Sequence, residues 1–159
     1  MDKILSFTLS SLMALMVMDV TWQILTRFLT DSPSSWSEEV ARFLLIWIGL
    51  LGAAWAYRKR AHLGLSYLIE KFSKASQQKF AIFSYLMAVL FAALVMIYGG
   101  MKLVLLTLEL NQMSASLGIK IGYVYMVIPA SGVLITLYAL DFIRAGISGE
   151  HYTNINKRK

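Results

Sequence analysis

Asp19 is the residue whose type and position most clearly allow chemistry, because it lies within a long apolar segment. An ionisable side chain surrounded by lipid is costly, so it usually faces protein, water or a partner chain. One interpretation is a proton or sodium site. The sequence favours a structural ion pair instead, since Asp19 and Arg42 each lie about one turn inside two antiparallel helices at roughly 1.5 Å per residue. Pairing with another subunit is the remaining alternative.

An acidic pair, Glu38 and Glu39, stands near the start of the next apolar segment, with Arg42 close behind. The spacings of four and three residues allow either acid to pair with Arg42 along one helix face. Adjacent helical residues diverge by about 100° and seldom converge on one substrate atom, which argues against a catalytic carboxylate pair. Because the sequence also carries no Ser-His-Asp set, phosphate loop or HExxH motif, we expect a protein that is not an enzyme.

His62 stands beside the basic run Arg58, Lys59 and Arg60. A metal site needs further ligands, but the second histidine is His151 in the polar tail, and cysteine is absent. We therefore expect neither a metal nor a cofactor, and we predict that Arg58 and His62 anchor this end of the span or contact a partner loop. A group of basic residues is predicted to contact lipid headgroups: Lys59, Arg60, Lys71 and Lys74.

The composition indicates that lipid is the solvent for most of the chain. Of the 159 residues, 58% are hydrophobic and only 15% are charged. A spanning helix needs about 20 mostly apolar residues. The sequence therefore predicts one all-α membrane domain over residues 1–159, with spans at about 4–25, 38–58, 80–101 with an extension to 110, and 121–143. We expect the first span to be retained and not cleaved as a signal peptide.

The distribution of Lys and Arg predicts the orientation. Basic residues precede the first span, follow the second and follow the fourth, and cytoplasmic loops carry such an excess, so both termini should be cytoplasmic. The net charge of +6 then indicates loops facing anionic lipid and not a nucleic-acid-binding surface. Apolar residues at helical spacing predict an interfacial amphipathic helix at about 62–75, with a solvated connector as the alternative. Residues 146–159 form a basic tail.

The third apolar segment is too long for a simple span. One helix from Phe80 to Leu110 would measure about 45 Å at 1.5 Å per residue, against a hydrocarbon core of about 30 Å. We predict that its outer end tilts strongly or projects beyond the bilayer, where it could meet an external partner.

Small residues predict close helix packing. Gly49 and Ala53 are four residues apart with Gly52 between them, and Gly99-Gly100 interrupt the third span. Such residues let membrane helices approach closely, and the spacing leaves open whether the neighbour lies in this chain or in another protein. Pro129 predicts a modest kink in the fourth span.

The residues at the two ends of the second span indicate where its helix starts and where it meets the membrane interfaces. Ser35 with Glu38 three residues later has the capping-box spacing, which predicts a helix start near Trp36. Trp36, Trp55 and Tyr57 fall near the two ends, where aromatic belts meet the membrane interfaces. We therefore interpret them as anchors and not as a ligand cage.

The run Trp36-Ser37-Glu38-Glu39-Val40-Ala41-Arg42, followed by Trp47, Leu51-Gly52-Ala53-Ala54, Arg58 and His62-Leu63, resembles the small membrane subunit of tripartite ATP-independent periplasmic (TRAP) transporters, the DctQ-like family. The close match lies between Trp36 and Leu63, and the four-span plan agrees over the whole chain. The family often carries an aspartate four residues after the histidine, where this chain has Ser66.

The resemblance implies a bacterial inner-membrane scaffold bound to a large DctM-like elevator subunit. It also implies a periplasmic DctP-like substrate-binding protein as partner and uptake driven by a sodium gradient, with sialic acid or a C4-dicarboxylate as substrate. In that family the substrate and sodium sites belong to the large subunit. The implied roles of the second-span residues and of Asp19 are structural or at the partner interface.

A self-sufficient, proton-coupled exporter of the small multidrug type is the rival hypothesis, with Asp19 as its working residue. That class is usually shorter, and its carboxylate sits nearer the middle of the span. Transport by the chain alone would favour the exporter, whereas inactivity without a second subunit would favour the scaffold.

Overall fold

The computed structural model describes residues 2–30, 34–59 and 74–147 of the chain. Within these ranges the protein is all-α, and four helical segments are long and apolar enough to cross a membrane: Lys3–Leu29, Ser35–Arg58, Ile82–Glu109 and Ile121–Arg144. The predicted fold class and number of spans are confirmed. The first span continues beyond its predicted end at residue 25. The predicted interfacial helix and the basic tail lie almost entirely outside the described residues.

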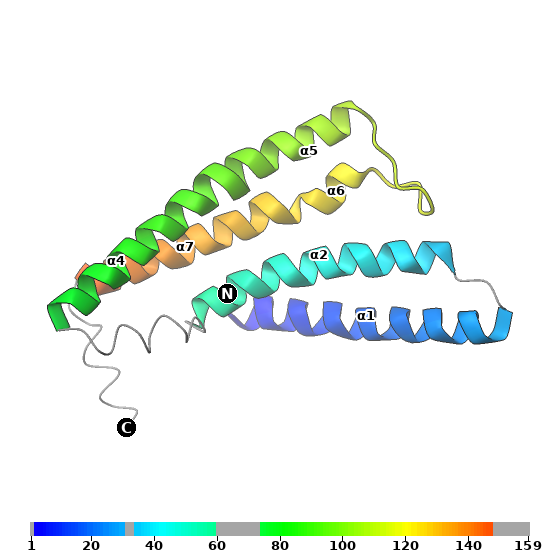
Figure 1. Cartoon of the computed structure of the whole chain (residues 1–159), viewed down its shortest axis with the longest axis horizontal. Coiled ribbons are helices and arrows are strands. Elements are labelled where there is room, and N and C mark those ends of the chain that lie inside the picture. Colours follow the sequence, from blue (N-terminus) through cyan, green and yellow to red (C-terminus); the bar gives the residue numbers. More distant parts are fainter. Residues whose placement is uncertain (1, 31–33, 60–73, 148–159) are drawn as a thin grey trace, which may run out of the picture.

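The helices form two antiparallel hairpins (Figure 1). The first consists of α1 (Asp2–Thr30) and α2 (Ser35–Arg58). The second pairs a long helix with a broken one. The long helix comprises α4 (Lys74–Phe91), a π-helical segment η1 (Ala92–Gly99) and α5 (Gly100–Glu109), and the broken helix comprises α6 (Ile121–Tyr125) and α7 (Val127–Ile147). Because α7 packs on both α4 and α2, it joins the hairpins.

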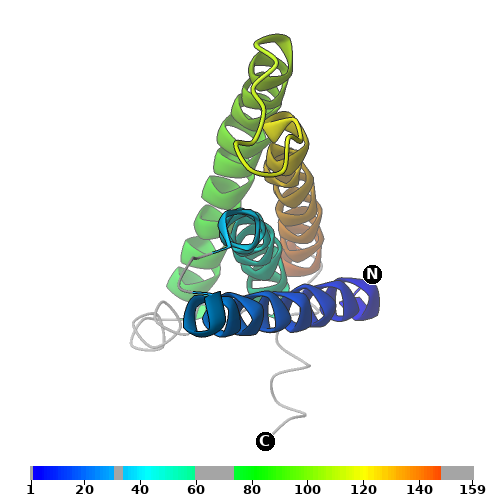
Figure 2. The same cartoon turned by 90° about the vertical axis from the view of Figure 1, so that its right-hand side faces the viewer.

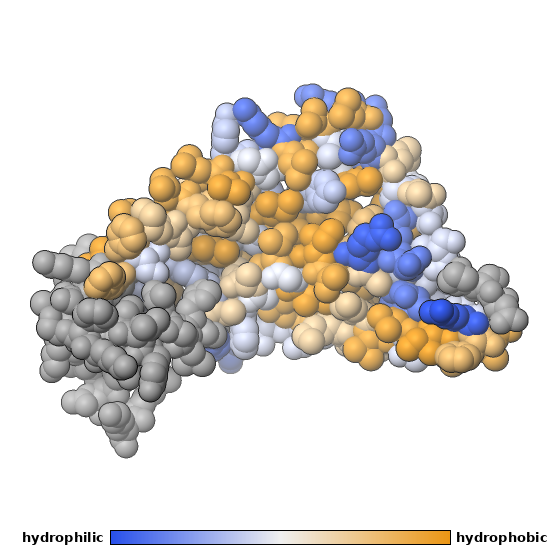
Figure 3. Space-filling view, viewed as in Figure 1, coloured by the Kyte–Doolittle hydropathy of each residue, from blue (hydrophilic) through white to orange (hydrophobic). Residues whose placement is uncertain are grey.

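α1 lies at the edge of the molecule and packs mainly on α2. Figure 2 shows it running across the foot of the other helices. Leu5 and Leu9 enter a core with Leu51, Val127 and Tyr138, whereas most of the remaining apolar side chains of α1 are exposed. Figure 3 shows hydrophobic residues over α4 and the far part of α1, and hydrophilic residues where α2 begins and α5 ends. An apolar exterior of this kind suits lipid or a membrane partner.

The long helix of the second hairpin is continuous to Glu109. Its stretch Ile82–Glu109 has 28 residues, or about 42 Å at 1.5 Å per residue, and exceeds a hydrocarbon core of about 30 Å. Whether its outer end tilts or projects beyond the bilayer stays a prediction. The π-helical turns lie where this helix meets α7, with Ala92 and Met96 buried in the contact.

Pro129 lies just after a break in the fourth span. α6 ends at Tyr125, α7 begins at Val127, and the Ala130 amide donates to the Met126 carbonyl at 3.2 Å. Proline is tolerated in the first turn of a helix, because its missing N–H would have no intrahelical acceptor there. The fourth span is thus interrupted at Met126, before the proline, and a kink at Pro129 itself stays a prediction.

Three glycines bring the second hairpin together. A Cβ added at Gly100 would lie 2.8 Å from Ile128 Cγ2, one at Gly122 2.6 Å from Leu108 Cγ, and one at Gly132 2.7 Å from Met96 Cβ. The predicted close approach at Gly99-Gly100 thus holds for Gly100. Gly99 faces only the Leu94 carbonyl of its own helix, at 3.6 Å.

The predicted capping box at Ser35 is wrong. The helix starts at Ser35 itself, with Ser34 as N-cap in an extended conformation and without a side-chain cap bond. The Ser34 carbonyl accepts instead from the Glu38 amide at 3.2 Å and from the Ser37 hydroxyl at 3.0 Å. Because Ser35 already belongs to the helix, its hydroxyl is not in the capping position.

Gly132→Ala should destabilise the chain by about 1–3 kcal/mol, the usual cost of overpacking, because the new methyl meets Met96 and the Ala92 carbonyl oxygen at 3.3 Å. The matched change Gly52→Ala meets nothing within 4 Å and should be neutral or slightly stabilising. Thermal unfolding of both variants in detergent measures the difference. Equal melting temperatures would contradict the tight contact at Gly132.

Candidate functional site

The last turns of α1 and the first turn of α2 are joined by the side-chain amide of Gln23. Gln23 Nε2 donates to Asp19 Oδ2 at 2.9 Å and to the Ser37 carbonyl at 3.0 Å. Ser37 is fully buried, so this bond lies within the contact between the two helices. The two hydrogens of one amide therefore bond a carboxylate on α1 and a carbonyl on α2.

Asp19 and Arg42 are not brought together in the part of the chain that the structure describes. Asp19 is half-buried beside Gln23, while Arg42 is exposed. Arg42 follows Ser37 by five residues, or about 140° around the helix at 3.6 residues per turn, so it points away from the face that meets α1. The predicted pairing within the chain is not formed. A pairing of Asp19 with another subunit stays a prediction.

Glu39 ties α2 to the loop between the second hairpin's helices. Its Oε2 accepts from the Ser116 amide at 2.9 Å and from the Leu117 amide at 3.1 Å. The same loop is closed by a bridge between Met113 and Lys120. The Glu39 carboxylate is thus directed to the loop and not along α2 to Arg42, and the predicted pair along the helix is wrong for Glu39.

Glu38, Trp36 and Arg42 remain on the surface at this end. Trp36 is 48% exposed, and Glu38 and Arg42 are also exposed. Within the described ranges Glu38 and Arg42 make no ion pair with each other. The structure therefore presents an aromatic ring, an acid and a base near the start of α2, where hydrophilic residues gather on the surface (Figure 3).

Trp47 joins the two hairpins in the middle of the membrane domain. Its Nε1 donates to the Val124 carbonyl at 3.0 Å, beside the break between α6 and α7. A carbonyl near a helix break in lipid needs a donor from a neighbouring helix. Trp47 therefore has a structural role inside this chain.

Arg58 lies against the aromatic side chains of α7. Its guanidinium carbon is 5.2 Å from the Tyr138 ring centroid and 5.8 Å from that of Phe142. Phe142 also contacts Tyr57 and Tyr85, with ring centroids 6.0 and 5.5 Å apart. Such cation–π contacts strengthen when they are partly desolvated. The predicted anchor at the inner end of α2 is thus attached to its own fourth span.

Gly49, Gly52 and Ala53 lie on the open side of α2. A Cβ added at Gly49 or Gly52 meets nothing within 4 Å, and Ala53 is exposed. The buried residues Leu51 and Ala54 lie on the opposite side, about 200° and 140° around the helix from Gly49. Close packing of these small residues inside the chain is therefore absent, and contact with another protein stays a prediction.

The remaining predicted residues are only partly described. Arg60, His62, Lys71 and the divergent Ser66 lie outside the described residues, and Lys74 is described only as the start of α4. Lys59 is exposed, with Nζ 5.7 Å from the Trp55 ring. Among the residues that the structure describes, no three His, Cys, Asp or Glu side chains are close enough to hold a metal ion.

Sequence reasoning missed Gln23 and the role of Glu39. Gln23 follows Asp19 by one helical turn, a spacing that allows a bond between the two side chains, so that signal was available. The contact of Glu39 with Ser116 spans 77 residues of sequence, and nothing local indicates it.

The chain is similar to known membrane proteins. The family model described as "Tripartite ATP-independent periplasmic transporters, DctQ component" matches residues 16–149. The sialic acid TRAP transporter small permease protein SiaQ of Vibrio cholerae is 42% identical over 60 residues, 38% of this chain and 35% of that protein. A putative TRAP transporter small permease protein of Haemophilus influenzae is 28% identical over 137 residues, 85% of this chain and 82% of that protein.

The sialic acid TRAP transporter permease protein SiaT of Haemophilus influenzae is 44% identical over 46 residues, 29% of this chain and 8% of that protein. The matched region is thus about a third of the Vibrio protein, a small part of SiaT and most of the Haemophilus small permease. The broad match and the local ones agree on the same class of transport component.

Glu39→Ala should release the loop from α2, because two charge-assisted bonds to backbone amides are lost together. We expect faster hydrogen exchange at Ser116 and Leu117 while the helices stay protected. Glu38→Ala removes an exposed carboxylate one residue earlier and serves as the control. Unchanged exchange in the Glu39 variant, or equal acceleration in both variants, would contradict the loop contact.

Proposed function

The chain belongs to the DctQ component family of tripartite ATP-independent periplasmic (TRAP) transporters, and we propose that it acts there as a static scaffold. It is a non-catalytic transport component and a multi-pass protein of the bacterial inner membrane, and its relatives imply a large permease subunit as partner. In this proposal it enlarges the fixed part against which the large subunit moves its transport domain.

The open face of α2 is the observation that carries the scaffold role. Gly49, Gly52 and Ala53 place small side chains along one stripe with free space before them. In membranes, small residues at this spacing allow a second helix to approach the backbone closely. The opposite face of α2 is fixed to α7 through Trp47 and Arg58. A partner docking here would therefore meet a helix that is held at several depths.

The same proposal assigns the start of α2 to the periplasmic side of the membrane. The Lys and Arg distribution predicts cytoplasmic termini, and with that orientation Trp36, Glu38 and Arg42 would face the periplasm. Their exposure supports a role in docking the soluble substrate-binding protein. The Glu39 contact would hold the neighbouring loop in place for that encounter.

The cargo in this proposal is an organic acid imported with sodium. Two relatives carry sialic acid in their names, which favours sialic acid, and a small dicarboxylate is the other candidate. Asp19 is given no part in ion coupling here, because its carboxylate is bonded to Gln23. That contact argues against the exporter hypothesis, in which the carboxylate must exchange its partner in each cycle.

Reconstitution in vesicles tests the assignment. We expect sodium-dependent uptake only when this chain, the large subunit and the binding protein are present together. The chain alone should move no solute. Asp19→Asn should keep most of the wild-type uptake by the complete system, since an asparagine oxygen can still accept from Gln23. Transport by the chain alone, abolished by this substitution, would establish the exporter instead.

Ala53→Leu should weaken co-purification with the large subunit at least about fivefold, because a bulky side chain on the docking stripe forces the helices apart. Ala130→Leu makes the same change at an exposed position of α7 and should have little effect. The melting temperature of each isolated chain controls for folding. Equal retention of the large subunit by both variants would remove the open face of α2 as its docking surface.

A further inference from the structure

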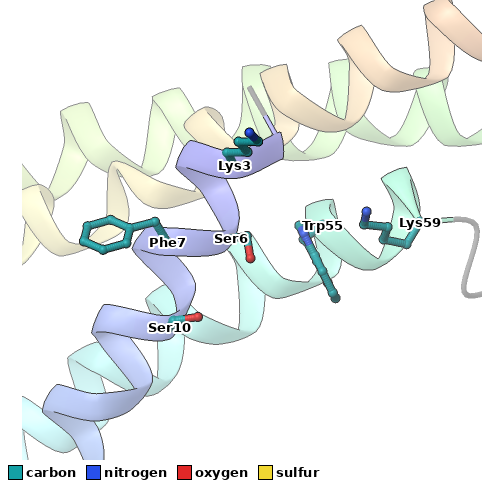
Figure 4. Close-up of a pocket in the computed structure, with 6 residues that line it drawn as sticks. All are labelled: Lys3, Ser6, Phe7, Ser10, Trp55 and Lys59. Atoms are coloured by element: carbon teal, nitrogen blue, oxygen red, sulfur yellow. The ribbon is translucent and has the colours of Figure 1, made fainter.

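A shallow cavity of about 460 Å³ opens between the first turns of α1 and the last turns of α2 (Figure 4). Its polar lining consists of Lys3, Ser6 and Ser10 on α1, and of Trp55 and Lys59 at the end of α2. These side chains supply two ammonium groups, two hydroxyls and an indole N–H. None of the described side chains that line the cavity is a carboxylate, so its polar groups are suited to an anion.

The indole N–H of Trp55, at the cavity, lacks a hydrogen-bond acceptor in the part of the chain that the structure describes. Its Nε1 is buried and has no hydrogen-bond partner among the described residues. Figure 4 shows the indole nitrogen on the side of α2 that faces Ser6 and Ser10. Leaving a buried donor unsatisfied is unfavourable, whereas a bond to a charged acceptor is among the stronger hydrogen bonds. An anionic oxygen that displaces the atoms now covering this nitrogen would satisfy the indole.

The position of the cavity indicates which kind of anion would bind there. It lies at the ends of two membrane-spanning helices, the depth at which lipid headgroups are found. Ile4 and Phe7 beside it are 72% and 75% exposed, and Phe7 points away from the polar side chains (Figure 4). A phosphate group inside the cavity would therefore leave its acyl chains along the apolar surface of α1.

We propose that this cavity binds the headgroup phosphate of an anionic glycerophospholipid. Lys3 and Lys59 neutralise the phosphate from two helices, and Trp55 donates to one of its oxygens. A zwitterionic lipid would bring a further ammonium group toward two lysines and should bind less well. The site would add a lipid-mediated link between the first turns of α1 and the last turns of α2. It does not depend on the proposed transport role.

Native mass spectrometry of the full-length chain in neutral detergent tests the site, with dioleoylphosphatidylglycerol, dioleoylphosphatidylcholine or inorganic phosphate added. We expect preferential retention of phosphatidylglycerol. Lys3→Gln and Lys59→Gln should each lower its affinity about fivefold, as expected for one basic residue near an anionic headgroup. Trp55→Phe keeps the ring, removes the N–H, and should lower the affinity at least about tenfold.

Lys102→Gln is the matched control, because Lys102 is exposed, lies over Tyr98 and does not line the cavity. It should leave the preference unchanged, and circular dichroism should show the same helix content in all variants. Equal binding of the two lipids would overturn the proposal. So would an equal loss of affinity in the control, or displacement of the lipid by inorganic phosphate at millimolar concentration, which would indicate a site for free phosphate.

Discussion

The structure depends on a few polar contacts between helices, which stabilise the fold because a membrane interior offers no water to bond. Two of these contacts end on backbone carbonyls: that of Ser37 accepts from Gln23, and that of Val124 accepts from Trp47. Each bond joins separate helices and so helps to set how the helices pack. The hairpins are therefore linked by a few polar contacts placed among apolar side chains, and these contacts determine which faces remain open.

The two hairpins differ in how closely they pack. In the second, Gly100, Gly122 and Gly132 bring η1 and α5 against α6 and α7, with no room for a Cβ. In the first, α1 meets mainly α2, and the glycines of α2 face open space. The second hairpin thus forms a close-packed unit, whereas the first offers surface to lipid and protein partners.

Hydropathy could predict the four spans, because lipid allows few backbone structures other than helices. It could not predict the side-chain partners. Asp19 and Arg42 are predicted to lie at similar depths in their spans. Depth does not determine the direction in which a side chain points around its helix axis, and Arg42 points away from α1. Small residues at helical spacing give the same sequence pattern whether or not a helix packs against them. A Cβ added at Gly100 would clash with a neighbouring helix, whereas one added at Gly49 would meet nothing within 4 Å. The loop contact of Glu39 arises only from tertiary packing, which no local pattern records.

The properties of α2 connect these contacts to the proposed scaffold role. Gln23 contacts the start of α2, where Glu39 also bonds the neighbouring loop, and the middle and the last turn of α2 are held through Trp47 and Arg58. A subunit against which another protein moves must resist displacement along its whole length, and contacts at three depths oppose both tilting and sliding. The stripe of small residues lies on the free face of this same helix. A partner bound there would therefore rest on a helix that is held both by α1 and by α7.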